Sequence, residues 1–184
     1  MTKVFVGGSR RINRLNEDIR LRIDRIIAKR FQLLIGDANG ADKAAQRYLH
    51  DRRYDRVRVF CSGDSARNNV GGWPLQVVRP PHSSRDFDYY ACKDRAMATE
   101  ATVGFMIWDG KSRGTLLNIL RLLSQGKAVV VHVGPKKAFA EVRSMRGFED
   151  LASTLDREAA RRLHEQAVSE GLADAAVYQA NLGF

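Results

Sequence analysis

The residues best suited to bind a ligand lie in one short loop, Trp108-Asp109-Gly110-Lys111-Ser112-Arg113-Gly114-Thr115. The loop follows an apolar run typical of a strand (103–107) and opens a segment, 116–123, whose apolar spacing is typical of a helix. Main-chain N–H groups at a helix N-terminus attract anions, and glycines let a ligand approach the backbone closely. Two hydroxyls and two cations add to this chemistry: Ser112, Thr115, Lys111 and Arg113. The loop therefore predicts a phosphate site, the alternative being a tight turn with Thr115 as a helix cap.

Two more glycine-containing loops follow predicted strands. Gly7-Gly8-Ser9-Arg10 comes after the strand Lys3–Val6, and Gly36-Asp37-Ala38-Asn39-Gly40-Ala41-Asp42 comes after the strand Phe31–Ile35. Each loop precedes a stretch with apolar residues three or four positions apart, as in a helix packed on a sheet. In parallel sheets such loops lie at the carboxyl ends of the strands, where ligands bind. We therefore expect the three loops to form one site.

The remaining pattern completes an α/β protein. Further strands are predicted at Val57–Cys61, Val103–Trp108 and Ala128–Val133, a short one at Leu75–Val78 within the loop-rich segment Ser62–Ser84, and a helix from Asp86 to Thr99. Strands that alternate with helices form a parallel sheet with right-handed crossovers. The expected fold is a Rossmann-like parallel sheet with helices on both faces, closed by the strand Ala128–Val133.

The pattern changes after Val133. It divides the chain into a Rossmann-like domain over 1–134 and a C-terminal helical extension over 135–184. Helices are predicted over Arg157–Glu170, which Gly171 ends, and over Leu172–Asn181. We expect the extension to pack on the same domain or to form an oligomer interface, and we expect a homo-oligomer.

Composition narrows the choice of partners. The 184 residues are 44% hydrophobic and 28% charged, and the net charge of +10 comes mainly from residues 1–60, with 15 basic and 7 acidic side chains. Acidic residues interleave with much of this charge, so nucleic acid is one option among several. No apolar run reaches 18 residues, no signal-peptide layout is present, and Cys61 and Cys92 form no paired motif. We expect a cytoplasmic protein without membrane contact, disulfide or metal site.

Four segments taken together resemble the successive signatures of a known superfamily. They are Val6-Gly7-Gly8-Ser9-Arg10, residues 36–45, Lys93-Asp94-Arg95-Ala96-Met97 and Trp108–Thr115. As an ordered set over about residues 3 to 134 they are similar to the SLOG superfamily of Rossmann-like proteins. This superfamily is related to the DNA-processing protein Smf and to the Lonely Guy cytokinin-activating enzymes. The chain most resembles the small YspA/YpsA-like branch, and the resemblance implies a nucleotide or nucleotide-derived ligand.

The Lonely Guy enzymes imply cleavage of an N-glycosidic bond that releases a base from a nucleoside monophosphate. Their phosphate loop matches Gly114 and Thr115 here, but the position of their glutamate holds Asn118. A neutral amide can hold a hydroxyl group but cannot act as a base. Carboxylates that could replace the glutamate are Asp37, Asp42, Asp94 and Asp109. Each of them has a structural alternative as a turn, helix-end or ion-pair residue.

The Smf relatives imply a different function, binding of single-stranded DNA at the same edge of the sheet. Their signatures are similar to residues 8–10, 36–42 and 94–95, and the basic charge agrees with that function. A clear row of aromatic residues for stacking bases is missing, although Trp108 could stack on a base or simply pack in the core. A nucleotide sensor without turnover is a third alternative.

The expected function is therefore binding of a nucleotide or nucleotide-derived phosphate ligand, with no cofactor required. Backbone N–H groups of Gly7–Arg10 and Arg113–Thr115 are expected to hold phosphate, and Arg10 and Arg113 to neutralise its charge. Asp37, Asp42 or Asp109 would accept hydrogen bonds from the ribose or the base. The full set of expected ligand-binding residues is Gly7, Gly8, Ser9, Arg10, Gly36, Asp37, Gly40, Ala41, Asp42, Lys93, Arg95, Trp108, Asp109, Gly110, Ser112, Arg113, Gly114, Thr115 and Asn118.

Overall fold

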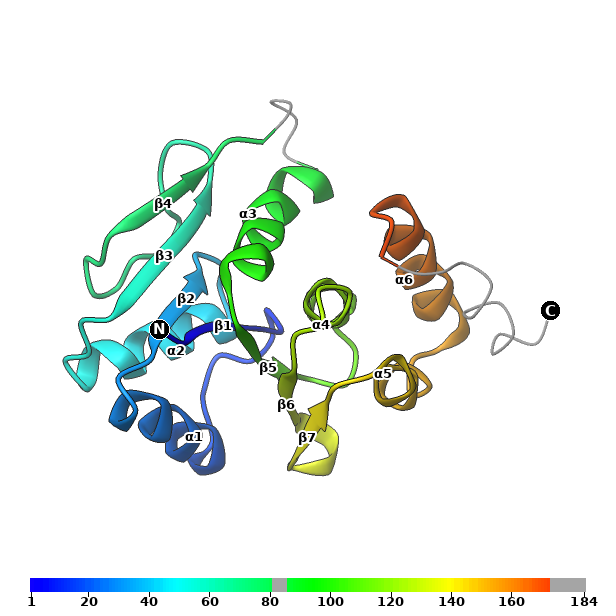
Figure 1. Ribbon diagram of the computed structural model, residues 1–184, viewed down its shortest axis with the longest axis horizontal. Coiled ribbons are helices and arrows are strands. Elements are labelled where there is room, and N and C mark those ends of the chain that lie inside the picture. The colour runs from blue at the N-terminus through cyan, green and yellow to red at the C-terminus, as the bar shows by residue number, and fades with distance from the viewer. Residues whose placement is uncertain (81–85, 173–184) are drawn as a thin grey trace.

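A computed structural model describes residues 1–80 and 86–172 and shows one seven-stranded sheet (Figure 1). The strand order is β4-β3-β2-β1-β5-β6-β7. All neighbouring strands are parallel except β6 and β7, which pair antiparallel. The strands are β1 (Lys3–Gly8), β2 (Gln32–Gly36), β3 (Val57–Ser62), β4 (Leu75–Val78), β5 (Val103–Trp108), β6 (Val129–Val133) and β7 (Ala138–Val142). The expected Rossmann-like α/β fold is confirmed.

Helices cover both faces of the sheet. They are α1 (Glu17–Ala28), α2 (Ala41–Asp51), α3 (Phe87–Glu100), α4 (Arg113–Leu123), α5 (Met145–Ala152) and α6 (Arg157–Ser169), with a short 3₁₀ turn, η1 (Gly134–Lys136). Val4 and Val6 of β1 pack in a cluster with α1 and α2, whereas Phe5 packs in the opposite cluster with α3 and α4. Successive side chains of a strand point to opposite faces, so the continuous apolar runs of β1 and β2 supply two cores.

Each predicted strand is present, but some boundaries and one edge differ from expectation. Helix α1 begins at Glu17, because the Asn16 side chain accepts a hydrogen bond from Ile19 N–H at 2.9 Å and caps the helix. The prediction that Ala128–Val133 closes the sheet is wrong. Residues 138–142, expected in a helical extension, form β7 and pair with β6 in register from Val133↔Ala138 to Val129↔Val142.

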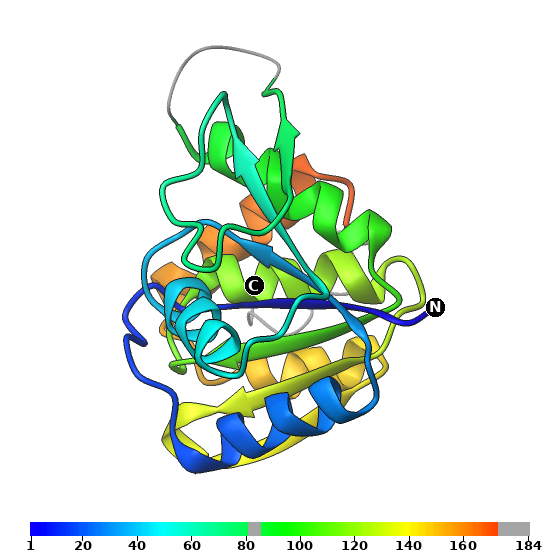
Figure 2. The ribbon, with the colours of Figure 1, turned by 90° about the vertical axis from the view of Figure 1, so that its left-hand side faces the viewer.

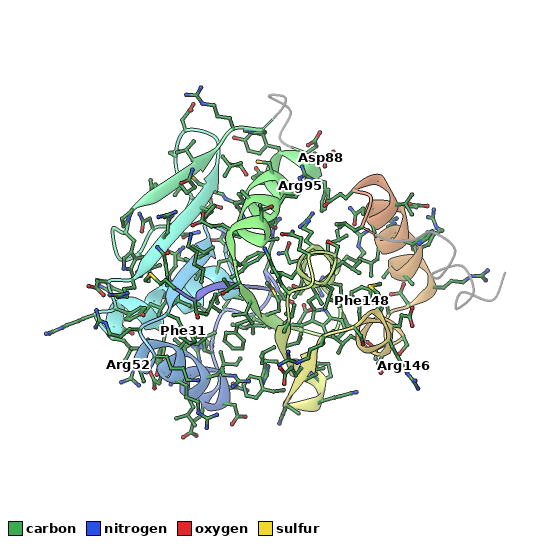
Figure 3. All side chains as sticks on the ribbon, viewed as in Figure 1. Phe31, Arg52, Asp88, Arg95, Arg146 and Phe148 are labelled. Atoms are coloured by element: carbon green, nitrogen blue, oxygen red, sulfur yellow. The ribbon has the colours of Figure 1, made fainter. Side chains whose placement is uncertain are left out.

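The C-terminal segment packs against the sheet's helices where it is described. Phe148 of α5 and Leu163 of α6 are fully buried in the cluster that contains α4, while Arg52 and Arg146 lie at the periphery (Figure 3). Of the predicted helix Leu172–Asn181, only Leu172 is among the described residues. Residues 81–84, at the end of the segment Ser62–Ser84, also lie outside them. Within 1–80 and 86–172, no helix is both long and apolar enough to cross a bilayer.

The sheet topology places a crevice between β1 and β5. From β1 the chain winds through β2, β3 and β4 on one side, and then returns to β5 and β6 on the other. The connections after β1, β2 and β5 therefore leave from the same edge, the left-hand edge in Figure 2. In open α/β sheets this switch of winding direction is where ligands bind.

Candidate functional site

Ser9 joins the three glycine-containing loops. Its N–H donates to Ile107 O at 2.9 Å, and its carbonyl accepts from Ala41 N–H at 3.1 Å. Its Oγ accepts from Asp109 N–H at 3.0 Å and lies 3.3 Å from Thr115 Oγ1. Ser9 is completely buried, so these bonds are shielded from water. The three loops gather at one edge of the sheet, as expected. Ser9 was expected to contact the ligand, but its hydrogen bonds connect the loops to one another.

Replacing Ser9 with Ala should lower the free energy of unfolding by about 2 kcal/mol, because the Asp109 N–H and the Thr115 hydroxyl both lose a buried partner. Ser153→Ala is the matched control, since its exposed Oγ only donates to Asp150 O and its loss should cost less than about 0.5 kcal/mol. Urea unfolding of the two variants measures the difference. Equal effects would show that Ser9 is not the tie between the loops.

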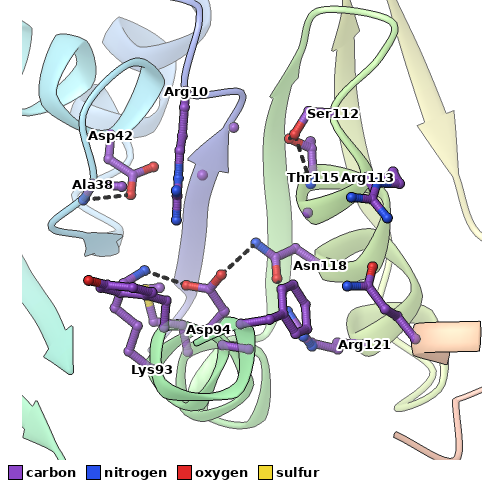
Figure 4. Close-up of a pocket in the computed structure, with 18 of the residues that line it drawn as sticks. Arg10, Ala38, Asp42, Lys93, Asp94, Ser112, Arg113, Thr115, Asn118 and Arg121 are labelled. Atoms are coloured by element: carbon purple, nitrogen blue, oxygen red, sulfur yellow. Dashed lines mark hydrogen bonds and ion pairs between the residues drawn. The ribbon is translucent and has the colours of Figure 1, made fainter. Parts of the chain in front are cut away.

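A cavity of about 670 Å³ opens at this edge, a volume suited to a small ligand (Figure 4). Expected site residues that line it from β1, the β1–α1 connection, α2 and α3 are Gly7, Gly8, Arg10, Asp42 and Lys93. Those that line it from the β5–α4 connection and α4 are Asp109, Ser112, Arg113, Gly114, Thr115 and Asn118. The structure thus brings together residues from four separate parts of the chain.

Other expected site residues lie outside the cavity lining. Trp108 is 1% exposed and donates its indole N–H to Ser112 O at 3.1 Å, so its ring packs in the core. Asp37 is buried and forms an ion pair of 2.7 Å with Arg67, which holds the pKa of Asp37 below its usual value against the opposing effect of burial. Arg95 pairs with Glu170 at 3.1 Å.

The expected glycines and Ala41 that fall outside the lining have packing roles. Ala41 lies against β1, where a Cβ on Gly8 would come within 2.8 Å of the Ala41 Cβ. Gly40 has φ +85°, and a Cβ there would lie 2.3 Å from Arg10 O; Gly110 has φ +83° and packs against Pro135. Such positions favour glycine because L residues rarely adopt positive φ. A Cβ on Gly36 would lie 2.4 Å from Asp42 Oδ2 and 2.9 Å from Lys93 Nζ.

Two main-chain donors of the α4 N-terminus are left for a ligand. Asp109 Oδ1 accepts from Lys111 N–H at 3.0 Å and Ser112 N–H at 2.8 Å, and Ser112 Oγ accepts from Thr115 N–H at 3.3 Å. Ser112, not Thr115, is therefore the N-cap. Within the described residues, Arg113 N–H and Gly114 N–H have no recorded acceptor. The expected phosphate cradle is thus corrected, because the N–H groups of Ser9 and Thr115 are already bonded.

An acidic and basic cluster forms one wall of the cavity. Lys93 Nζ lies 2.5 Å from Asp94 Oδ1, and Asp94 lies between Lys93 and Asn118, whose amide donates to Asp94 Oδ2 at 3.4 Å (Figure 4). Burial lowers the pKa of Lys93, but attraction to Asp94 and Asp42 outweighs burial and leaves the pKa raised. Burial, opposed by Lys93 and assisted by Asp94, raises the pKa of Asp42 to about 7. The cavity therefore contains a fixed ammonium group beside a carboxyl group that exchanges a proton near neutral pH.

The free energy of unfolding should depend on pH through the titration of Asp42. Its pKa is about 7 in the folded protein against an ordinary value of 3.8. The folded state therefore binds more protons than the unfolded chain between these pH values, and the contribution of Asp42 to the free energy of unfolding falls as pH rises. Asp42→Asn removes it, so the free energy of unfolding of the variant relative to the unaltered protein should rise from pH 4.5 to 7.5. Urea unfolding at several pH values measures this difference. A difference that stays constant with pH would contradict the raised pKa.

A polar chain connects this wall to helix α6. Arg121 donates to Asn118 Oδ1 at 2.5 Å, and its guanidinium forms two hydrogen bonds with Glu170, at 2.8 and 2.5 Å. Arg121 is 2% exposed, and its buried charge is neutralised by Glu170 at the end of α6. Sequence analysis did not single out Arg121 or Gln166, which also lines the cavity. The three-residue spacing from Asn118 to Arg121 places both side chains on one face of a helix and could have indicated Arg121. No sequence pattern indicated Gln166.

Four cationic side chains surround the cavity without a recorded ion pair in the described structure: Arg10, Arg11, Lys111 and Arg113. Arg10 projects from the β1–α1 connection toward the middle of the cavity, and its guanidinium carbon lies 5.8 Å from the centre of the Tyr90 ring (Figure 4). The guanidinium carbon of Arg67 lies 4.7 Å from the centre of the same ring. The cavity therefore combines a cationic rim with an aromatic side wall.

The described residues contain no group of three His, Cys, Asp or Glu side chains placed to hold a metal ion. The groups available to a ligand are instead hydrogen-bond donors, namely main-chain N–H and guanidinium groups, together with carboxyl and amide oxygens that accept hydrogen bonds. This set of groups suits an anion that also carries hydrogen-bond donors of its own. Comparisons of the chain with protein-family models, with curated proteins and with solved structures find no match.

Proposed function

We propose that this protein binds a nucleotide or nucleotide-derived phosphate in the cavity at the β1–β5 crevice, as a SLOG-type Rossmann-like protein. The observation that carries the proposal is the first turn of α4. The N–H groups of Arg113 and Gly114 have no acceptor in the described structure, and the cationic side chains of Arg113 and Lys111 lie beside them in the cavity lining. Helix N-termini with adjacent cations are favourable sites for phosphate groups.

The opposite wall suits the sugar and base. Asp42, Asp94 and Asn118 offer carboxyl and amide groups to hydroxyl or amino groups of a ligand. Attraction to Lys93 holds the two carboxyl groups in place, and Asn118 is held by its hydrogen bonds with Asp94 and Arg121. A simple inorganic anion would gain nothing from these carboxylates and would be repelled by them. The combination therefore favours a phosphate ester that carries hydrogen-bond donors.

A second proposed function, hydrolysis of the base–sugar bond, is favoured by Asp42. Asn118 cannot act as a base, but the carboxyl of Asp42 lines the cavity and has a pKa near 7. In the proposed step, a water molecule loses a proton to Asp42 and forms a bond to the anomeric carbon. The bond between that carbon and the base nitrogen breaks, and Asp42 returns the proton to the departing base. The products are a free base and a sugar phosphate.

Native mass spectrometry of the protein with a panel of nucleoside phosphates, followed by chromatography for released bases, tests both proposals. A saturable complex with a nucleotide supports binding, and release of base that is lost in Asp42→Asn supports hydrolysis. A tight complex without released base indicates a sensor. Binding of single-stranded oligonucleotides that falls steeply with salt, without binding of any mononucleotide, would overturn the proposal in favour of a nucleic-acid-binding protein.

A further inference from the structure

Helix α6 presents one face to the Rossmann-like domain. Leu163 and Ala167 are completely buried, and Glu170 binds Arg121 and Arg95 one turn further along. Residues at intervals of three and four share a face of a helix, so Gln166 lies between these anchors. The position of Gln166 is therefore fixed by apolar packing on one side and by a buried ion pair on the other.

Gln166 is the residue of α6 that lines the cavity. Its Oε1 is shielded from solvent and accepts no hydrogen bond within the described part of the chain. A buried polar atom without a partner is unfavourable, and such atoms in native proteins are commonly paired by a ligand or water. Arg121, which also lines the cavity, directs its hydrogen bonds to Asn118 and Glu170 rather than to Gln166 Oε1.

We propose that Gln166 is a ligand-contacting residue that selects the group attached to the phosphate. Its amide accepts a hydrogen bond from an N–H of the base or an O–H of the sugar. This inference rests on the proposed function and extends it, because the segment after residue 134 then completes the site. The Rossmann-like domain holds the phosphate at α4, and α6 recognises the organic part of the ligand.

The test is isothermal titration of the protein with four nucleoside monophosphates, ribose 5-phosphate and inorganic phosphate. Gln166→Leu keeps the size of the side chain but removes its hydrogen bonds. We expect it to weaken the best nucleotide at least tenfold and to leave inorganic phosphate unchanged. Glu165→Leu is the matched control, since Glu165 is exposed on the same helix and pairs only with Arg161 in the described structure. It should bind every ligand as the unaltered protein does.

The outcomes separate the inference from the function on which it rests. Equal loss for ribose 5-phosphate and the nucleotide identifies a sugar hydroxyl as the donor, and loss for the nucleotide alone identifies the base. Unchanged nucleotide affinity in Gln166→Leu overturns the role of Gln166 and leaves the proposed function standing. If the unaltered protein binds none of these phosphates, the proposed function fails, and the inference fails with it.

Discussion

Arg113→Ala is expected to weaken the binding of a nucleoside monophosphate about a hundredfold. Arg113 lines the cavity from the first turn of α4, where its guanidinium adds to the N–H groups of Arg113 and Gly114. A charged hydrogen bond contributes about 1.5 to 3 kcal/mol, and a hundredfold loss corresponds to about 2.7 kcal/mol. Stability without ligand should change little, because Arg113 is part of no ion pair recorded in the described structure. Titration calorimetry and thermal melting measure the two effects.

The matched control is Arg146→Ala. Arg146 is an exposed arginine in the first turn of α5, so it shares the local setting of Arg113 but lies outside the cavity lining (Figure 3). We expect it to bind the nucleotide as the unaltered protein does. A nucleotide affinity that is the same in Arg113→Ala and Arg146→Ala would place the phosphate elsewhere.

Gly8→Ala should lower the free energy of unfolding by about 3 kcal/mol, since overpacking against a fixed backbone is costly. A Cβ on Gly8 would lie 2.3 Å from Ile107 O and 2.8 Å from the Ala41 Cβ. These atoms belong to β5 and α2, the elements that must meet β1 for the loops to converge. Chemical unfolding measures the loss, and the residual folded protein should also bind nucleotide more weakly.

Gly114→Ala provides the comparison within the same site. Its Cβ would meet nothing within 4 Å, and it lies in a regular helix. We therefore expect it to raise the free energy of unfolding by about 0.5 to 1 kcal/mol, because alanine restricts the unfolded chain more than glycine does. If both substitutions destabilise equally, then close packing of β1 on β5 and α2 is not what Gly8 provides.

The strands and glycine-containing loops could be predicted because their signals are local. A run such as Phe31–Ile35 followed by small residues indicates a buried strand and a turn without knowledge of its neighbours. The meeting of the loops at one edge followed from the general topology of parallel sheets. The residue that joins them did not, since the bonds of Ser9 reach Asp109 and Thr115, a hundred or more positions away.

Trp108 and Asp37 show why single residues in a correct loop can be assigned wrongly. Both occupy the carboxyl end of a strand, where a side chain can point into the crevice or back into the protein. Trp108 packs in the core, where its indole N–H donates a hydrogen bond to Ser112 O. The Asp37 carboxylate accepts a hydrogen bond from Arg67 in the β3–β4 connection. The spacing of residues in the sequence indicates neither Ser112 nor Arg67 as a partner, because each contact depends on the conformation of a loop.

The strand β7 was missed for a different physical reason. Its residues, Ala138 to Val142, are mostly exposed, and an edge strand needs only one neighbour. The alternation of Phe139 and Glu141 with smaller residues is too short to distinguish a strand from a loop. Its pairing with β6 and the packing of α6 on α4 are long-range effects, and so is the contribution of Gln166 to the cavity.

The central claim is that phosphate binds at the first turn of α4. The most direct test follows the backbone amide resonances of Gly114 and Arg113 by ¹H–¹⁵N NMR while a nucleoside monophosphate is added. We predict a large, saturable shift of the Gly114 amide, reproduced by inorganic phosphate at higher concentration, with no shift at the Arg146 amide at the start of α5. Saturable binding that leaves the Gly114 amide unmoved would contradict the account.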